Sequence, residues 1–202
     1  MRNFSLLLIL TFSNLSSTFS LWQSNSPTPS STTVAAEKIS IPGILNAGKI
    51  SDSLFRGAQP DVSHLAELKK LGITTIVDLR RESSQTRERE KNQAESLGMH
   101  FISIPVGGFS TPTSAQLAEF FAAVRGIPLQ KIFVHCQFGE DRTGLFIASY
   151  RIAFDHWTPK QAMAEMLDFG FHRLWHPAMA DFVESLPDRL QSDPTLKTFF
   201  GH

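Results

Sequence analysis

One short segment of this sequence contains most of the residues that could do chemistry. It reads VHCQFGEDRTG, over residues 134–144, and it holds the only cysteine among the 202 residues. His135 directly precedes Cys136, and Arg142 follows after five intervening residues. A thiolate is a strong nucleophile, and a guanidinium can bind two oxygens of a tetrahedral anion at once. The pattern therefore indicates a cysteine placed to attack a bound oxyanion.

The elements predicted around this segment suit an anion-binding loop. Residues 131–136, KIFVHC, form a short apolar run typical of a buried strand, and a long apolar helix is expected to begin at Thr143. The backbone N–H groups of such a turn, together with the first helical turn, make a concave anion site, and Gly139 permits the sharp turn. The loop residues expected to bind substrate are Gln137, Phe138, Gly139, Glu140 and Gly144.

Several side chains of the segment have predicted catalytic roles. A cysteine beside a cation or a helix N-terminus has its pKa lowered to roughly 3.5–7.5, so Cys136 is expected to be a thiolate at neutral pH. Thr143 can donate its hydroxyl to the sulfur, and His135 is expected to orient the loop rather than transfer a proton. The alternative is that Cys136 is a buried small apolar residue, as most free cysteines are.

The rest of the sequence alternates helical and strand patterns. Helical spacing of leucines over residues 65–71 ends at Gly72, and a β-branched run to residue 79 indicates a strand. A charged run over 80–95 predicts a solvated helix, and 99–106 predicts a second strand. Further helices are expected over 113–125, with a Thr113–Gln116 capping box, from Thr158 to Gly170, and over 177–186. We predict a single compact α/β domain with a central, mostly parallel sheet flanked by helices.

Two segments of different composition precede this domain. The first residues carry a positive charge at Arg2 and an apolar run from Phe4 to Phe12, a pattern that resembles a secretory signal and is shorter than the roughly 20 residues of a membrane-spanning helix. We interpret residues 1–22 as a signal peptide or an uncleaved apolar tail, 23–40 as a Ser/Thr/Pro-rich linker, and 41–202 as the catalytic domain. The expected location is exported, either periplasmic or secreted, without stable membrane insertion after signal removal. A cytoplasmic location follows if the segment is not a functional signal.

These motifs resemble the cysteine-based protein tyrosine phosphatase superfamily. His, Cys, five residues, Arg and then Thr is its signature, and HCQFGEDRTG is most similar to its dual-specificity branch, in particular to bacterial members related to atypical plant and fungal enzymes. The segments NAGKISDSLFRGAQP, LGITTIVDLR, GMHFISIPV and DHWTPKQAMAEMLDFGF resemble other parts of that domain. Arsenate reductases and low-molecular-weight phosphatases share the spacing but carry it near the amino terminus. The resemblance implies a dual-specificity-phosphatase-like fold and a phosphomonoester hydrolase that forms a cysteinyl-phosphate on Cys136, with Arg142 binding phosphate.

The general acid is where the sequence departs from this family. Its members commonly protonate the leaving oxygen with an aspartate on a loop before the cysteine, but the corresponding residues 104–116, IPVGGFSTPTSAQ, contain no acid. Asp141 is the leading substitute, because the myotubularin branch uses an aspartate immediately before the loop arginine. Alternatively, Asp141 only stabilises the helix N-terminus by its charge. Glu140 is a weaker candidate.

Charge limits the partners and the substrate. Lys+Arg and Asp+Glu both number 19, whereas a nucleic-acid-binding protein would be more basic. A phosphorylated substrate, either a phosphoprotein or a small phosphomonoester, is the expected partner. Glu140 and Asp141 repel dense anions and favour a singly phosphorylated molecule. The alternatives are an inositol-phosphate or phosphoinositide phosphatase, and a phosphate-binding module of the same fold with weak turnover.

Three other residues were candidates for function. Arg56 is expected to form an ion pair with a buried carboxylate such as Asp78 rather than to bind substrate. His172 and His176 are four residues apart and could suggest a metal pair on a helix, but Pro177 interrupts the pattern and no third ligand follows. We therefore predict neither a metal nor a cofactor.

Overall fold

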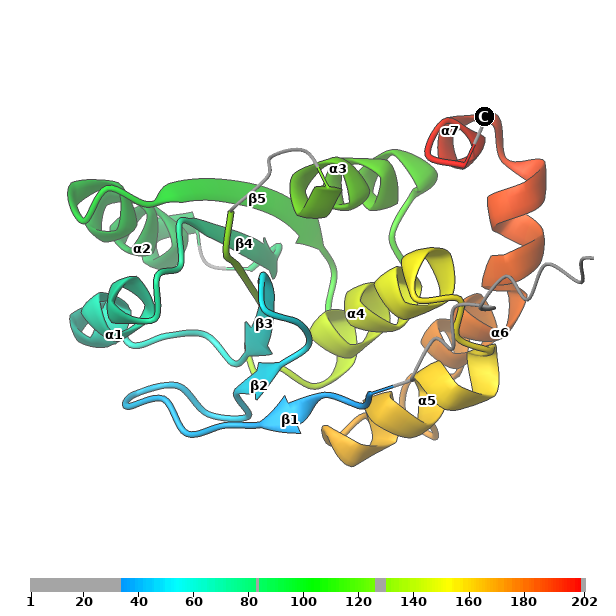
Figure 1. The fold of residues 1–202 in the computed structure, drawn as a ribbon, viewed down its shortest axis with the longest axis horizontal. Helices are drawn as coiled ribbons and strands as arrows, with labels where there is room; N and C mark the ends of the chain where they lie inside the picture. The colour runs from blue at the N-terminus through cyan, green and yellow to red at the C-terminus, as the bar shows by residue number, and fades with distance from the viewer. Residues whose placement is uncertain (1–33, 83, 126–129, 201–202) are drawn as a thin grey trace, which may run out of the picture. The chain divides into compact units, whose positions relative to one another are not determined.

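The computed structural model describes residues 34–82, 84–125 and 130–200. Six strands form one mixed sheet in the order β1-β2-β3-β6-β4-β5 (Figure 1). The strands are β1 Glu37–Lys38, β2 Gly48–Lys49, β3 Leu54–Gly57, β4 Thr75–Arg80, β5 His100–Val106 and β6 Ile132–His135. The predicted signal peptide and residues 23–33 of the predicted linker lie outside the described ranges, while Glu37 and Lys38, near the end of that linker, already pair with β2.

The central strand β6 pairs in parallel with a strand on each side. Ile132 lies opposite Leu54 of β3 and opposite Thr75 of β4, and β4 pairs in parallel with β5. The two antiparallel pairs, β1 with β2 and β2 with β3, form the other edge. The predicted α/β fold with a mostly parallel central sheet is thus confirmed, with an added antiparallel edge. In this arrangement the carboxyl ends of four neighbouring strands, β3, β6, β4 and β5, lie at one side of the sheet.

Helices cover both faces of the sheet (Figure 1). They are the short 3₁₀ helix η1 Val62–His64, α1 Leu65–Lys70, α2 Ser84–Ser96, α3 Ser114–Arg125, α4 Asp141–Phe154, α5 Pro159–Asp168, α6 Pro177–Ser192 and α7 Pro194–Lys197. The capping box predicted at Thr113 is present, because the Thr113 N–H donates to Gln116 Oε1 and the Gln116 N–H donates to Thr113 Oγ1. Pro177 begins α6, so His172 and His176 lie before that helix. Within the described ranges, no helix has the length and hydropathy to cross a bilayer.

Two apolar clusters pack on opposite faces of the sheet. Successive residues of a strand point to opposite faces, so Val77 and Val134 enter the larger cluster with α3, α4, α5 and α6. Ile76 and Phe133 enter the smaller one with residues of α1 and α2. Both clusters hold side chains with no exposed surface, and they fix β4 and β6 between two layers. The loop that follows β6 is therefore anchored at its first residue.

A buried network of charges joins β4, α2 and β6. Arg80 donates to Asp78 Oδ1 at 2.8 Å and to Glu90 Oε2 at 2.6 Å, and His135 Nε2 lies 2.8 Å from Glu90 Oε1. The prediction of a helix in the charged run 80–95 is confirmed for α2, but its full solvation is wrong, because Glu90 and Ala94, one turn apart, are buried. The predicted ion pair between Arg56 and Asp78 is also wrong, since Asp78 instead pairs with Arg80 and Arg87.

The network predicts a large stability loss when its cation is removed. Arg80→Met keeps the volume of the side chain but leaves two buried carboxylates without their shared partner, so the free energy of unfolding should fall by about 3–5 kcal/mol in urea denaturation. The adjacent exposed Arg81 supplies the control, and Arg81→Met should change it by less than about 0.5 kcal/mol. Equal effects of the two substitutions would contradict the role given to Arg80.

Candidate active site

The candidate site is the loop that connects the carboxyl end of β6 to the N-terminus of α4. Cys136 is the first loop residue, and Arg142 lies in the first turn of α4, which begins at Asp141, two residues before the predicted start. A cleft of about 300 Å³ opens over this loop. It is lined by Gly108, Phe109, Cys136, Phe138, Glu140, Asp141, Arg142, His172, Trp175 and His176.

Three consecutive carbonyl groups of the loop are tied outward, to the segment 46–59. The pairs are Gln137 O with the Gln59 N–H at 3.3 Å, Phe138 O with Asn46 Nδ2 at 3.5 Å, and Gly139 O with Arg56 Nη2. In a trans peptide the following N–H points opposite to the carbonyl, so three N–H groups point the other way. Successive N–H groups turned to one side make an anion-binding concavity.

Gly139 is the tightest position of the loop. Its φ is +74°, and a Cβ atom there would lie 2.5 Å from the backbone carbon of Gly57. Arg56, which binds the Gly139 carbonyl, is fully buried and stacks on the Phe169 ring at 4.0 Å, and burial lowers the pKa of Arg56 to about 10. The predicted need for glycine in the turn thus has a second cause, which is close contact with β3.

The Cys136 side chain is only 3% exposed, yet its surroundings favour the thiolate. Burial raises the pKa of Cys136, but hydrogen bonds from the hydroxyl and the N–H of Thr143, the charge of Arg142 and a bond from the Gly139 N–H together lower it below its ordinary value. The Thr143 hydroxyl is buried and bonds to no oxygen or nitrogen, so it is available to the sulfur. The loop therefore holds a thiol whose pKa is lowered beside backbone N–H groups that point into the same concavity.

Arg142 is held by a carboxylate that the sequence interpretation missed. Its Nη1 donates to Glu82 Oε2 at 2.7 Å and to the Val106 carbonyl at 3.0 Å. Burial works to raise the pKa of Glu82, but the Arg142 hydrogen bond and charge lower it overall. Glu82 follows the carboxyl end of β4 by two residues, and this position beside the central strand is the signal that could have identified it.

His135 lies behind the loop rather than in the cleft. Its Nδ1 lies 3.1 Å from the Cys136 carbonyl oxygen, and its Nε2 faces Glu90. Burial lowers the pKa of His135, but the charge and hydrogen bond of Glu90 outweigh burial and raise it. The ring thus connects the nucleophile's backbone to the buried charge network, a position suited to orientation.

The remaining loop residues divide between the cleft and the protein interior. Asp141 Oδ2 lies 3.3 Å from His176 Nε2, and Asp141 Oδ1 accepts a long hydrogen bond of 3.4 Å from the His172 N–H. Burial and the nearby Asp141 charge raise the pKa of Glu140. Gly144 lies against the side chain of Met166 instead of lining the cleft. Within the described ranges, no three His, Cys, Asp or Glu side chains are grouped as a metal site would require.

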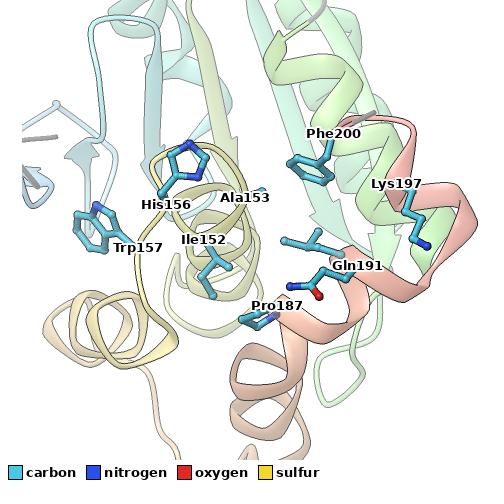
Figure 2. A pocket seen from close by; sticks show the side chains of 9 residues that line it. Ile152, Ala153, His156, Trp157, Pro187, Gln191, Lys197 and Phe200 are labelled. Atoms are coloured by element: carbon cyan, nitrogen blue, oxygen red, sulfur yellow. The ribbon is translucent and has the colours of Figure 1, made fainter. Parts of the chain in front are cut away.

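Larger cavities lie beyond the other end of α4. One of about 630 Å³ is formed between α4, α6 and the end of the described chain (Figure 2). Its walls are mainly apolar, including Ile152, Trp157 and Pro187, and the polar side chains there are His156, Gln191 and Lys197. None of these residues is a thiol, whereas Cys136, the sole cysteine of the sequence, lines the cleft over the loop. The smaller cleft is therefore the candidate active site.

Comparison with known proteins identifies the family. Residues 43–174 match the family described as "DSP-PTPase phosphatase fused to NAD+ Kinase". The chain belongs to this family. The resemblance inferred from HCQFGEDRTG is thus confirmed, and the matched range of the DSP-PTPase family contains the whole loop.

Individual relatives agree with the family assignment. The chain is 30% identical over 134 residues to the dual specificity protein phosphatase TpbA of Pseudomonas aeruginosa, covering 63% of this chain and 56% of that protein's length. A crystal structure of P. aeruginosa TpbA in complex with pTyr matches with a TM-score of 0.64 and 21% identity, over 85% of this chain and 99% of that one. The core catalytic domain of the PP-IP phosphatase SIW14 from S. cerevisiae matches with a TM-score of 0.61 and 20% identity, over 78% of this chain and 98% of that domain. At these identities the structural matches show a shared fold.

The pKa of Cys136 predicts a measurable effect of Thr143→Val. Removing the hydroxyl that stabilises the thiolate should raise the pKa, so iodoacetamide should alkylate the variant more slowly at neutral pH, with the midpoint of the rate–pH curve shifted upward. The chain has one cysteine, so alkylation followed by mass spectrometry reports on this sulfur alone. Ser149→Ala, which removes another buried hydroxyl of α4, is the control and should leave the midpoint in place. A Thr143→Val midpoint at or below that of the wild type would disprove the assignment.

Proposed function

We propose that this chain is a phosphomonoester hydrolase of the protein-tyrosine and dual-specificity phosphatase type. The observation that carries the proposal is the Cys136 thiol with its lowered pKa, inside a loop whose N–H groups turn away from three outward-tied carbonyls. In the proposed reaction Cys136 attacks phosphorus and forms a cysteinyl-phosphate, which water then hydrolyses. Arg142 and the loop N–H groups bind the phosphoryl oxygens, and Thr143 stabilises the departing thiolate.

Arg142 has the position required for phosphate binding. The two hydrogen bonds of its Nη1, to Glu82 and to Val106, set the direction of the planar group at the edge of the cleft. A guanidinium held in this way loses little rotational freedom when it binds two phosphoryl oxygens. Glu82 thus acts as a positioning residue for Arg142 in the proposal.

The surroundings of the cleft favour a singly phosphorylated substrate with an aromatic or apolar body. Phe109, Phe138 and Trp175 line the cleft and are 77%, 65% and 72% exposed. Glu140 and Asp141 add negative charge beside Arg142, and like charges repel a densely phosphorylated molecule. A phosphotyrosine side chain fits these features. Inositol polyphosphates fit these features less well. The similarity to the PP-IP phosphatase SIW14, at 20% identity, shows a shared fold and does not indicate a shared substrate.

We also propose that the protein is exported. This part rests on the pattern of residues 1–22, where Arg2 precedes the apolar run Phe4–Phe12 and small polar residues follow. Fractionation of cells that express the full chain, with mass spectrometry of the mature N-terminus, checks this. Recovery of the intact N-terminus in the cytoplasm would contradict it.

The catalytic proposal predicts the behaviour of two variants. With an aryl phosphate, the wild-type protein should release a burst of phenol whose molar amount equals that of the enzyme. Steady turnover should follow, with a phosphate adduct on Cys136. Cys136→Ser should remove both phases. Arg142→Lys should lower kcat by about 10² to 10³-fold, because the ammonium group is a point charge and cannot bind two phosphoryl oxygens as the planar guanidinium does. Arg125→Lys, at the exposed end of α3, should match the wild type. Phosphate binding without turnover would favour the binding module, and turnover by Cys136→Ser would exclude the mechanism.

Substrate choice can be tested by reversing one charge. The wild type should have a higher kcat/KM for a phosphotyrosine peptide than for inositol hexakisphosphate, and Glu140→Lys should narrow that ratio by at least about tenfold by removing repulsion. Glu119→Lys makes the same change of net charge at an exposed position of α3 and should leave the ratio of the two kcat/KM values unchanged. A wild type that prefers the inositol polyphosphate would overturn the substrate class while leaving the cysteine mechanism intact.

A further inference from the structure

The proton needed by the leaving group must come from a side chain that lines the cleft. Residues 104–116, where related enzymes place their acid, contribute Gly108 and Phe109 to the cleft and no carboxylate. The side chains of the cleft that can carry a transferable proton are Glu140, Asp141, His172 and His176. Of these, Asp141 and His176 contact one another, with Oδ2 and Nε2 3.3 Å apart.

His176 is held firmly although it belongs to no regular element. It is the N-cap residue of α6, its side chain makes no capping hydrogen bond, and it is 8% exposed. Its ring stacks on Phe109 with centroids 4.9 Å apart and lies 6.2 Å from the Phe171 ring. The Nδ1 atom is buried and has no hydrogen-bond partner in the protein. A buried polar nitrogen beside a catalytic cleft, without a partner, calls for a ligand atom that completes it.

The contact resolves a conflict over Asp141. An aspartate side chain is ordinarily a carboxylate near neutral pH, and a carboxylate cannot donate a proton. The Asp141 carboxylate lies against His176 Nε2, and imidazole is the side chain most often used for proton transfer near neutral pH. The carboxylate can then remain charged at the helix N-terminus while its partner supplies the proton.

We propose that His176 is the general acid of this active site and that Asp141 is the positioning residue that holds it. The inference rests on the proposed phosphatase function. As the Cys136 sulfur bonds to phosphorus and the bond to the leaving oxygen breaks, the imidazolium gives its Nδ1 proton to that oxygen, and a neutral alcohol or phenol departs. Water then attacks the phosphocysteine, the neutral imidazole takes one proton from it, and the products are inorganic phosphate, the thiolate and the imidazolium.

Phe109 governs access to the proposed donor. It covers the imidazole by stacking, and 77% of its own surface faces solvent, so only one side of the ring is engaged. Catalytic hydrogen bonds are often incomplete without substrate and form in the complex.

Leaving-group dependence tests the proposal. A poor leaving group needs a proton in the transition state, whereas 2,4-dinitrophenolate departs without one. His176→Asn should therefore lower kcat/KM for phenyl phosphate by about 10²-fold or more and change it little for 2,4-dinitrophenyl phosphate. Asp141→Asn should also lower kcat/KM more for phenyl phosphate than for 2,4-dinitrophenyl phosphate. The double variant should have a kcat/KM for phenyl phosphate no lower than that of the less active single variant, because the two residues act as one unit.

Controls separate chemistry from folding. Asparagine is a favoured N-cap residue, so His176→Asn should keep α6, which circular dichroism and thermal unfolding check. His156→Asn removes another imidazole just beyond the carboxyl end of α4, about 20 Å along the helix axis from the loop. It should leave kcat/KM unchanged for every leaving group. An equal loss for every leaving group would show a structural role for His176 and overturn the proposal.

Two further outcomes discriminate between the hypotheses. A leaving-group-dependent loss in Glu140→Gln with none in His176→Asn would transfer the acid role to Glu140 and overturn the inference. Hydrolysis of 2,4-dinitrophenyl phosphate that depends on Cys136, with unchanged leaving-group dependence in His176→Asn, would refute the acid assignment alone. Hydrolysis that survives Cys136→Ser would instead remove the proposed function, and the inference with it.

Discussion

Three hydrogen bonds that point away from the cleft give the loop its chemical character. The carbonyl groups of residues 137–139 bond to Gln59, Asn46 and Arg56, all from the segment that leads into and out of β3. Because each peptide is planar, fixing the carbonyl on the outside fixes the next N–H on the inside. The direction of these N–H groups is thus set by residues some eighty to ninety positions earlier in the chain, among which Arg56 is fully buried. The contact of Gly139 with Gly57 allows the loop and β3 to approach closely enough for these bonds.

The backbone of Cys136 is anchored by buried charges as well as by apolar contacts. Arg80, Asp78, Glu90 and His135 are all buried, and they connect the two central strands to α2. Buried ion pairs add little net stability when compared with apolar packing, but each member becomes costly when its partner is lost. Such a network favours one arrangement of the strands and of the His135 ring. It therefore fixes the starting point of the loop, while the outward bonds fix its course.

Local patterns were sufficient for the fold and for the loop. The strand that ends at His135, the capping box at Thr113, the helix start at Thr158 and the Cys-to-Arg spacing depend on neighbouring residues, so they could be recognised in the sequence. The partners of the loop could not, because Glu82, Glu90 and His176 reach it from three other segments through tertiary packing. The expected pairing of Arg56 with Asp78 failed for the same reason. Opposite charge alone does not predict which cation pairs with Asp78. Its partner is Arg80, two residues further along the same strand β4.

A single sulfur whose pKa is lowered also has a consequence for the reaction of the protein with oxidants. Peroxides react with thiolates, and the first product, a sulfenic acid, is commonly protected by condensation with a nearby thiol. A chain with one cysteine has no internal resolving thiol, and a sulfur that is 3% exposed hinders a disulfide between two copies. Recovery from oxidation then depends on a small external thiol or on ring closure with a backbone nitrogen. The cradle that activates Cys136 thus leaves the protein dependent on the redox state of its surroundings.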